Sequence, residues 1–96
     1  MGKKEIIEIL RRYKHEFAEQ YGIEKIGVFG SVARDDIREV SDVDVVLRIT
    51  KPDLFTLAGI KDDLEKRFNQ PVDIITYRDD MNPFLRNRID GEAVYV

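Results

Sequence analysis

The chain has 96 residues, no cysteine and a net charge of −3, with 16 Lys and Arg against 19 Asp and Glu. This length predicts a single domain over residues 1–96. The absence of cysteine excludes disulfides and thiolate metal sites, and the acidic balance argues against sequence-independent binding of nucleic acid. No secretory h-region or long apolar run is present, so the sequence supports neither secretion nor a membrane span and favours a cytoplasmic protein.

Apolar spacing predicts the elements of the first half of the chain. Apolar residues at steps of three and four predict a helix from residue 3 to about 20, which ends at Gly22. A short buried strand is predicted over 25–29, and Ser31 can cap a short helix over 32–34. A polar loop then leads to a second strand from about 43 to 49.

The second half alternates in the same way. Pro52 and Asp53 open a helix whose predicted apolar stripe consists of Leu54, Leu57, Ala58, Leu64 and Phe68. A third strand is predicted over 72–76, and Asn82 with Pro83 starts a last helix that Gly91 stops. Residues 93–96 form either a short strand or a packed tail. This order predicts an α/β (α+β) domain with helices packed against a small, mixed β-sheet.

Carboxylates gather around the second and third predicted strands. Because side chains alternate along a strand, Asp42 and Asp44 point to one face, and Asp73 at the start of the third strand can join them. Mg²⁺ takes hard oxygen ligands, including one or two carboxylates and substrate phosphates. Three carboxylates can bind two ions, one for a triphosphate and one to lower the pKa of an attacking hydroxyl. Asp73 can also take the proton of that hydroxyl.

The turn after the first strand has the residues of a phosphate site. Gly30 lets the backbone approach a phosphate without a side chain in the way. Ser31 offers a hydroxyl and an N–H at a predicted helix N-terminus, where anions are favoured. Arg34 can bind a phosphate through two hydrogen bonds from its guanidinium group.

Each feature taken singly also has a structural explanation. Gly30-Ser31 can be a turn with a cap, Asp42 a solvated turn residue, and Asp73 a polar strand start. Arg34 can form surface ion pairs with Asp35, Asp36 or Glu39. The order of these features along three strands is what favours a catalytic or nucleotide-binding site.

These residues resemble a known signature. Gly30-Ser31-Val-Ala33-Arg34 followed by Ser41-Asp42-Val-Asp44 is similar to the motif of the DNA polymerase β-like nucleotidyltransferase superfamily, in its minimal nucleotidyltransferase (MNT) branch. The resemblance covers essentially the whole chain. It implies that Gly30 and Ser31 hold the nucleotide, and that Asp42, Asp44 and Asp73 bind two Mg²⁺ ions. The family often has glycine after the arginine, where this chain has Asp35.

The resemblance also implies a function and a partner. Minimal members are similar to antitoxins of type VII-like toxin–antitoxin pairs, whose partner is typically a HEPN-domain RNase. The implied activity is Mg²⁺-dependent transfer of AMP from ATP to a tyrosine of that toxin. A chain of 96 residues leaves no room for a separate acceptor domain, so we expect the acceptor to be a docked protein. Oligomers would then form through the partner complex.

Two other functions remain open at this stage. The chain can neutralise the toxin by stoichiometric binding alone, through the stretch 77–88 and the apolar tail 93–96. Transfer to tRNA or to a small molecule such as an aminoglycoside is less favoured, because the chain is acidic and lacks a second domain.

Overall fold

The computed structural model describes residues 2–34 and 42–96, and the predicted loop and Ser41 lie outside this range. Its elements are α1 (Lys3–Tyr21), β1 (Ile23–Phe29), β2 (Val43–Ile49), α2 (Leu54–Phe68), β3 (Val72–Thr76), α3 (Pro83–Glu92) and β4 (Val94–Tyr95). The helices and strands expected from apolar spacing are therefore present, and the carboxy-terminal residues form a strand.

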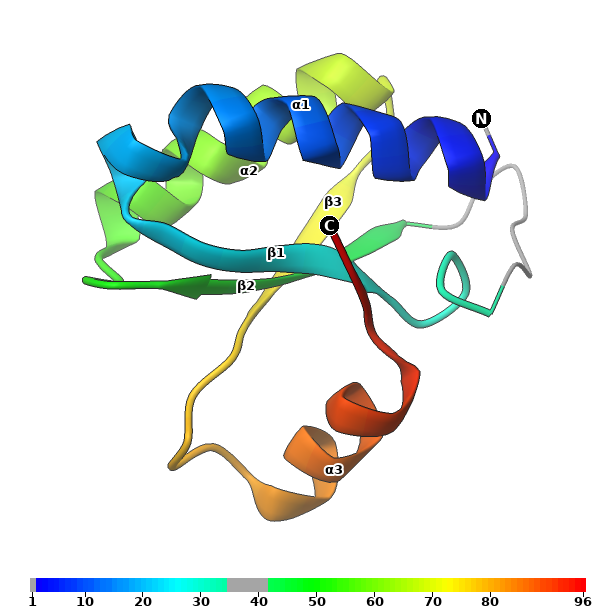
Figure 1. Cartoon of the computed structure of the whole chain (residues 1–96), viewed down its shortest axis with the longest axis vertical. Coiled ribbons are helices and arrows are strands. Elements are labelled where there is room, and N and C mark those ends of the chain that lie inside the picture. Colours follow the sequence, from blue (N-terminus) through cyan, green and yellow to red (C-terminus); the bar gives the residue numbers. More distant parts are fainter. Residues whose placement is uncertain (1, 35–41) are drawn as a thin grey trace.

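Figure 1 shows how these elements follow one another along the chain. The four strands form one sheet in the order β3-β2-β1-β4. β2 runs antiparallel to β1 and parallel to β3, and β4 pairs antiparallel with β1. The parallel pair is possible because α2 carries the chain from the end of β2 back to the start of β3. The prediction of a small mixed sheet is confirmed.

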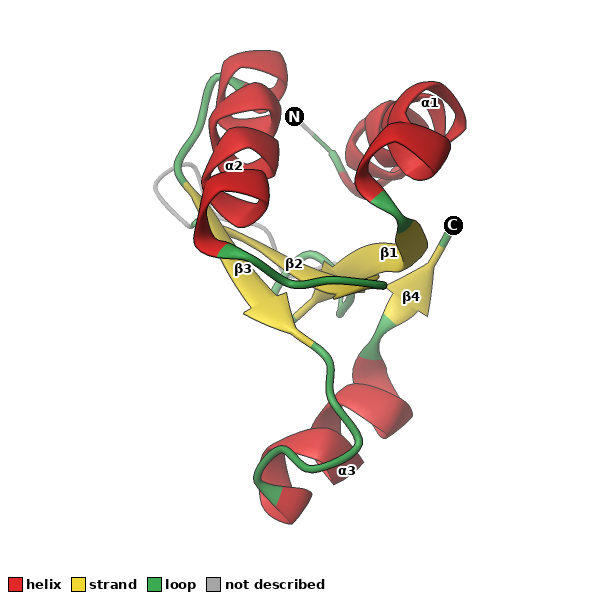
Figure 2. Cartoon of the chain, turned by 90° about the vertical axis from the view of Figure 1, so that its left-hand side faces the viewer, coloured by secondary structure: helices red, strands yellow, loops and turns green. Residues whose placement is uncertain are grey.

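The helices cover both faces of this sheet (Figure 2). α1 and α2 lie side by side on one face, over a core that includes Leu10, Tyr13, Val45, Leu47 and Leu64. α3 lies against the other face, over a smaller cluster of Phe29, Val46 and Ile89. Strand side chains that point away from α1 and α2 therefore lie on the same side of the sheet as α3.

Gly22, the predicted end of the first helix, and Gly27 are both required by the local backbone geometry. Gly22 adopts a left-handed conformation with φ of 67° and donates its N–H to the Ala18 carbonyl, which ends α1. A Cβ on Gly27 would overlap the backbone of Val94, because β4 passes directly against β1 at this point. Only glycine allows this close pairing.

Four local expectations are wrong. The predicted helix over 32–34 is a single turn, closed by the Arg34 N–H donating to the Gly30 carbonyl at 3.1 Å. One hydrogen bond offsets little of the entropy of ordering a helical turn, so helix formation needs more residues. α3 continues through Gly91 to Glu92. The side chains of Leu54 and Phe84, expected on apolar helix faces, are 83% and 78% exposed.

None of the helices in residues 2–34 and 42–96 combines the length and the apolar composition required to cross a membrane.

Candidate active site

Asp44 and Asp73 lie opposite each other on neighbouring parallel strands. The register of β2 and β3 pairs Asp44 with Asp73. Residues paired in this way project to the same face of a sheet. Val45 on β2 belongs to the core under α1 and α2, and Val46 belongs to the cluster under α3. The alternation therefore places both carboxylates on the α3 face.

The turn after β1 begins at Gly30, which lies beside Asp44. β1 pairs Phe29 with Asp44, and Gly30 follows with a φ of 70°. A Cβ on Gly30 would lie 2.6 Å from Oδ2 of Asp44, which is too close for a real contact. The glycine is thus required both by its backbone conformation and by the carboxylate beside it.

Burial and the neighbouring carboxylates disfavour the ionised form of Asp44. Burial raises the pKa of Asp44, the carboxylates of Asp73 and Asp42 raise it further, and the Arg34 guanidinium lowers it. Asp42 itself is exposed just before β2. A cation bound here would offset the repulsion among these carboxylates.

Two arginines and a glutamate border the carboxylates. Arg34 contacts Oε1 of Glu92 at 3.9 Å, and Arg88 contacts Oε2 of the same residue at 3.6 Å. The Arg88 guanidinium also lies over the Phe29 ring, 5.5 Å from its centroid. Arg88 and Glu92 carry no sequence signal as site residues, since only the packing of α3 brings them to the turn.

The turn over 31–34 is held by the amino-terminal end of α1. Nζ of Lys3 donates to the Ala33 carbonyl at 3.0 Å. Because Ser31 starts a turn and not a helix, the predicted helix-dipole contribution to anion binding is wrong. Affinity for a phosphate would have to come from backbone N–H groups and from the arginines. Asp35, where the family pattern often has glycine, lies outside the described residues.

The donor set fits a metal bound together with a phosphate. Within the described ranges, no three His, Cys, Asp or Glu side chains form a group that could hold a metal ion by themselves. Asp44 and Asp73 are nevertheless paired in register, and Mg²⁺ usually takes only one or two protein carboxylates plus substrate phosphates. The structure brings these two together with Gly30, while Asp42 acts on Asp44 through its charge.

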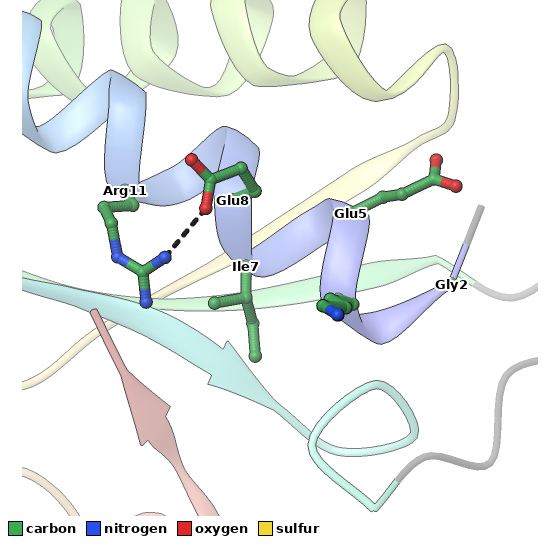
Figure 3. Close-up of a pocket in the computed structure, with 6 residues that line it drawn as sticks. Gly2, Glu5, Ile7, Glu8 and Arg11 are labelled. Atoms are coloured by element: carbon green, nitrogen blue, oxygen red, sulfur yellow. Dashed lines mark hydrogen bonds and ion pairs between the residues drawn. The ribbon is translucent and has the colours of Figure 1, made fainter.

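A separate hollow of about 590 Å³ runs along the amino-terminal turns of α1 (Figure 3). Its lining residues include Ile7 and the ion pair between Glu8 and Arg11. None of the predicted site residues lines it, so its size does not identify the reactive centre.

Comparison with known protein families and curated proteins gives consistent results. The family model described as "Polymerase beta, Nucleotidyltransferase" matches residues 4–96. A protein of Methanocaldococcus jannaschii named "putative protein adenylyltransferase" is 34% identical over 93 residues, which cover 96% of this chain and 95% of the relative. The "protein adenylyltransferase MntA" of Thermococcus cleftensis is 32% identical over 94 residues, which cover 97% and 94%.

Solved structures share the fold. A structure described as a "putative minimal nucleotidyltransferase" superposes with a TM-score of 0.81 at 30% identity, covering 98% of this chain and 95% of the other. An MNT antitoxin solved in complex with a tri-AMPylated HEPN toxin of Shewanella oneidensis has a TM-score of 0.70 at 13% identity, with coverages of 97% and 70%. A toxin–antitoxin structure with AMP-PNP has a TM-score of 0.71 at 15% identity, with coverages of 88% and 69%. At these identities the last two show the fold alone.

Proposed function

Because the chain belongs to the polymerase β nucleotidyltransferase family and to its minimal branch, we propose that it transfers AMP from ATP to a tyrosine of a HEPN toxin, as its antitoxin. The main structural support for this proposal is the pairing of Asp44 with Asp73, together with the close approach of Gly30 to the Asp44 carboxylate. Relatives named as protein adenylyltransferases support AMP transfer to a protein. The solved complexes of similar fold support ATP as the donor and a HEPN toxin as the partner.

The chain's own residues divide the binding of the triphosphate among them. Gly30 leaves its backbone open to the phosphates, and Ser31 adds a hydroxyl and an N–H at the start of the turn. Arg34 and Arg88 offset the negative charge, and we expect each to exchange its contact with Glu92 for a phosphate oxygen. Asp44 and Asp73, paired in register, would hold Mg²⁺ together with phosphate oxygens, and Asp42 would join them only once the ion and the triphosphate are bound. The ion would neutralise charge at the phosphates and activate the hydroxyl.

The transfer itself is a substitution at the α-phosphorus of ATP. The tyrosine oxygen forms a bond to this phosphorus while the bond to the β-phosphate bridging oxygen breaks, so pyrophosphate leaves. The proton of the tyrosine hydroxyl passes to the Asp73 carboxylate, which is exposed on the edge strand β3 and thus open to an acceptor from outside.

Co-expression of this chain with the toxic product of the adjacent gene tests the proposal. We expect wild type to restore growth and both Asp42→Asn and Asp44→Asn to fail, although both variants fold and bind the partner. Asp62→Asn is the matched control, because this carboxylate is exposed on α2 and forms a surface ion pair with Lys66 at 3.0 Å. Full neutralisation by both site variants would overturn the proposal.

That outcome would favour stoichiometric binding, for which α3 is the relevant surface. Phe84 remains 78% exposed there. Arg86 and Arg88, which lie in the predicted docking stretch 77–88, already contact the Asp79 carbonyl and Glu92 within the chain. The tail is engaged as well, since the Val96 N–H donates to the Ile26 carbonyl and its own carbonyl accepts from Lys14. A toxin that stays silent after this chain is removed would exclude binding as the whole explanation.

A further inference from the structure

One edge of the sheet is open beside Asp73. β3 is the outermost strand, next to β2. The Val43 N–H donates to the Pro71 carbonyl and the Tyr77 N–H to the Leu47 carbonyl, so the backbone groups of 71 and 77 face β2. These groups alternate sides along a strand, so those of Ile74 and Thr76 face away from the sheet.

Within residues 2–34 and 42–96, the first outward backbone group of this edge has a hydrogen-bond partner and the later ones have none. The Val72 N–H, which also faces outward, donates to a carboxylate oxygen of Glu65 at 2.9 Å. Ile74 and Thr76 come next along the strand, with Asp73 immediately before them. The open portion of the edge therefore begins at the proposed catalytic base.

A groove of about 340 Å³ runs between this edge and α2. Its lining includes Leu54, Ala58 and Lys61 from α2, and Asp73, Ile74 and Thr76 from β3. Leu54, at the amino-terminal end of α2, is 83% exposed. The groove is thus partly apolar, and its lining includes Asp73, a residue of the proposed active site.

We propose that the acceptor segment of the partner protein binds here as an extended strand added to β3. This inference rests on the proposed function. An extended polypeptide supplies alternating N–H and C=O groups, which the free groups of Ile74 and Thr76 require. A phosphodiester backbone has no donor for their carbonyls, and the acidic chain disfavours nucleic acid.

The geometry of an added strand also defines which of its side chains reach the site. A residue directly opposite Asp73 projects onto the same sheet face, with Cβ atoms about 4.5–5.5 Å apart. A tyrosine at that position has its hydroxyl on the face that carries Asp44. The residues before and after it project to the α2 face, onto Leu54 and Ala58. The acceptor segment therefore has apolar residues on both sides of the modified tyrosine.

Two pairs of variants test the edge and the groove separately. Thr76→Pro removes the outward N–H without removing a bond to β2, as proline allows on an edge strand, and Thr76→Val keeps the N–H. Ala58→Glu places a charge in the groove. Gly59→Glu places the same charge on the next residue of α2, which does not line the groove and has open space at its Cβ.

The readouts are the KM for the product of the adjacent gene and the Kd for ATP, measured on the intact protein. We expect Thr76→Pro and Ala58→Glu each to raise this KM by about tenfold, the effect of losing about one hydrogen bond or apolar contact. The Kd for ATP should stay unchanged, and both controls should behave as wild type. An unchanged KM in Thr76→Pro and Ala58→Glu would overturn the inference.

Photocrosslinking separates this inference from the proposed function. With benzoylphenylalanine at position 58, the crosslinked peptide of the partner should contain the modified tyrosine or its immediate neighbours, and position 59 should give no such product. A crosslink to this segment without AMP transfer would support the docking surface and contradict the proposed function. AMP transfer with crosslinks that lie elsewhere on the partner would contradict the docking surface alone.

Discussion

Gly30 is the residue where backbone conformation and site chemistry depend most directly on each other. It holds a φ of 70°, and the position of its missing Cβ lies 2.6 Å from Oδ2 of Asp44. A side chain here would displace the Asp44 carboxylate, which is paired in register with Asp73 on β3. The turn and the carboxylate pair therefore form one unit.

Gly30→Ala should accordingly lower both stability and activity. The left-handed conformation costs a non-glycine residue about 1–2 kcal/mol, and a carboxylate displaced by about 1 Å lowers transfer by about a hundredfold. Thermal unfolding and kcat/KM measure the two effects. Gly91→Ala is the control, because a Cβ there meets open space. Wild-type kcat/KM in Gly30→Ala would contradict this account of the site.

Asp44→Asn should instead separate stability from activity. Burial and the neighbouring Asp73 and Asp42 raise the pKa of Asp44, so its ionised form is less favourable in the folded chain than in the unfolded chain. At neutral pH without Mg²⁺, the neutral variant should unfold at a higher urea concentration than wild type, while transfer is lost. Asp62→Asn, on the surface of α2, should change neither. A lower urea midpoint for Asp44→Asn would show that this carboxylate stabilises the fold.

At the scale of elements, the start of α2 makes stability depend on pH. Oδ1 of Asp53 accepts hydrogen bonds from the backbone N–H groups of Phe55 and Thr56, and Oδ2 accepts one from the Thr56 hydroxyl at 2.7 Å. The Thr56 contacts in particular hold the pKa of Asp53 below its ordinary value. Its stabilising contribution is therefore complete above the unfolded-state pKa and is lost as the pH falls through the folded-state pKa.

Asp53→Asn keeps an acceptor oxygen for the cap but removes this titration. We expect the free energy of unfolding to fall less on acidification in the variant than in wild type, as measured by urea unfolding across the acidic range. Identical pH dependence in the two proteins would show that the charge of Asp53 contributes nothing to the cap.

Capping residues and apolar spacing predicted most boundaries of the helices and strands. They did not predict features that depend on tertiary packing. Gly22 and Asn82 act at the helix ends as their residue types indicate. The turn after Gly30 resembles a helix start in sequence, yet the described residues close only one turn. Leu54 and Phe84 are apolar, but each lies in the first turn of its helix and is left exposed to solvent. Neither outcome can be read from residue type or spacing.

At the scale of the whole molecule, the sheet brings distant parts of the chain into one site. The register of β2 and β3 pairs Asp44 with Asp73, and Gly30 follows β1 beside Asp44. Arg88 and Glu92 lie on α3 and form an ion pair there. Strand alternation predicted a shared face for Asp42 and Asp44, and only that Asp73 can join them. The register that pairs them, and the packing of α3 against the turn, depend on tertiary contacts, so the sequence alone could not predict the roles that we assign to Arg88 and Glu92.

The intact mass of the partner protein shows whether this chain transfers AMP to it. The product of the adjacent gene is incubated with this chain, ATP and Mg²⁺, and its mass is compared with that from a parallel reaction with Asp44→Asn. We predict a gain of one or more AMP units with wild type and no gain with the variant. An unchanged mass, in a complex that still co-purifies and blocks the toxin, would contradict the enzymatic account.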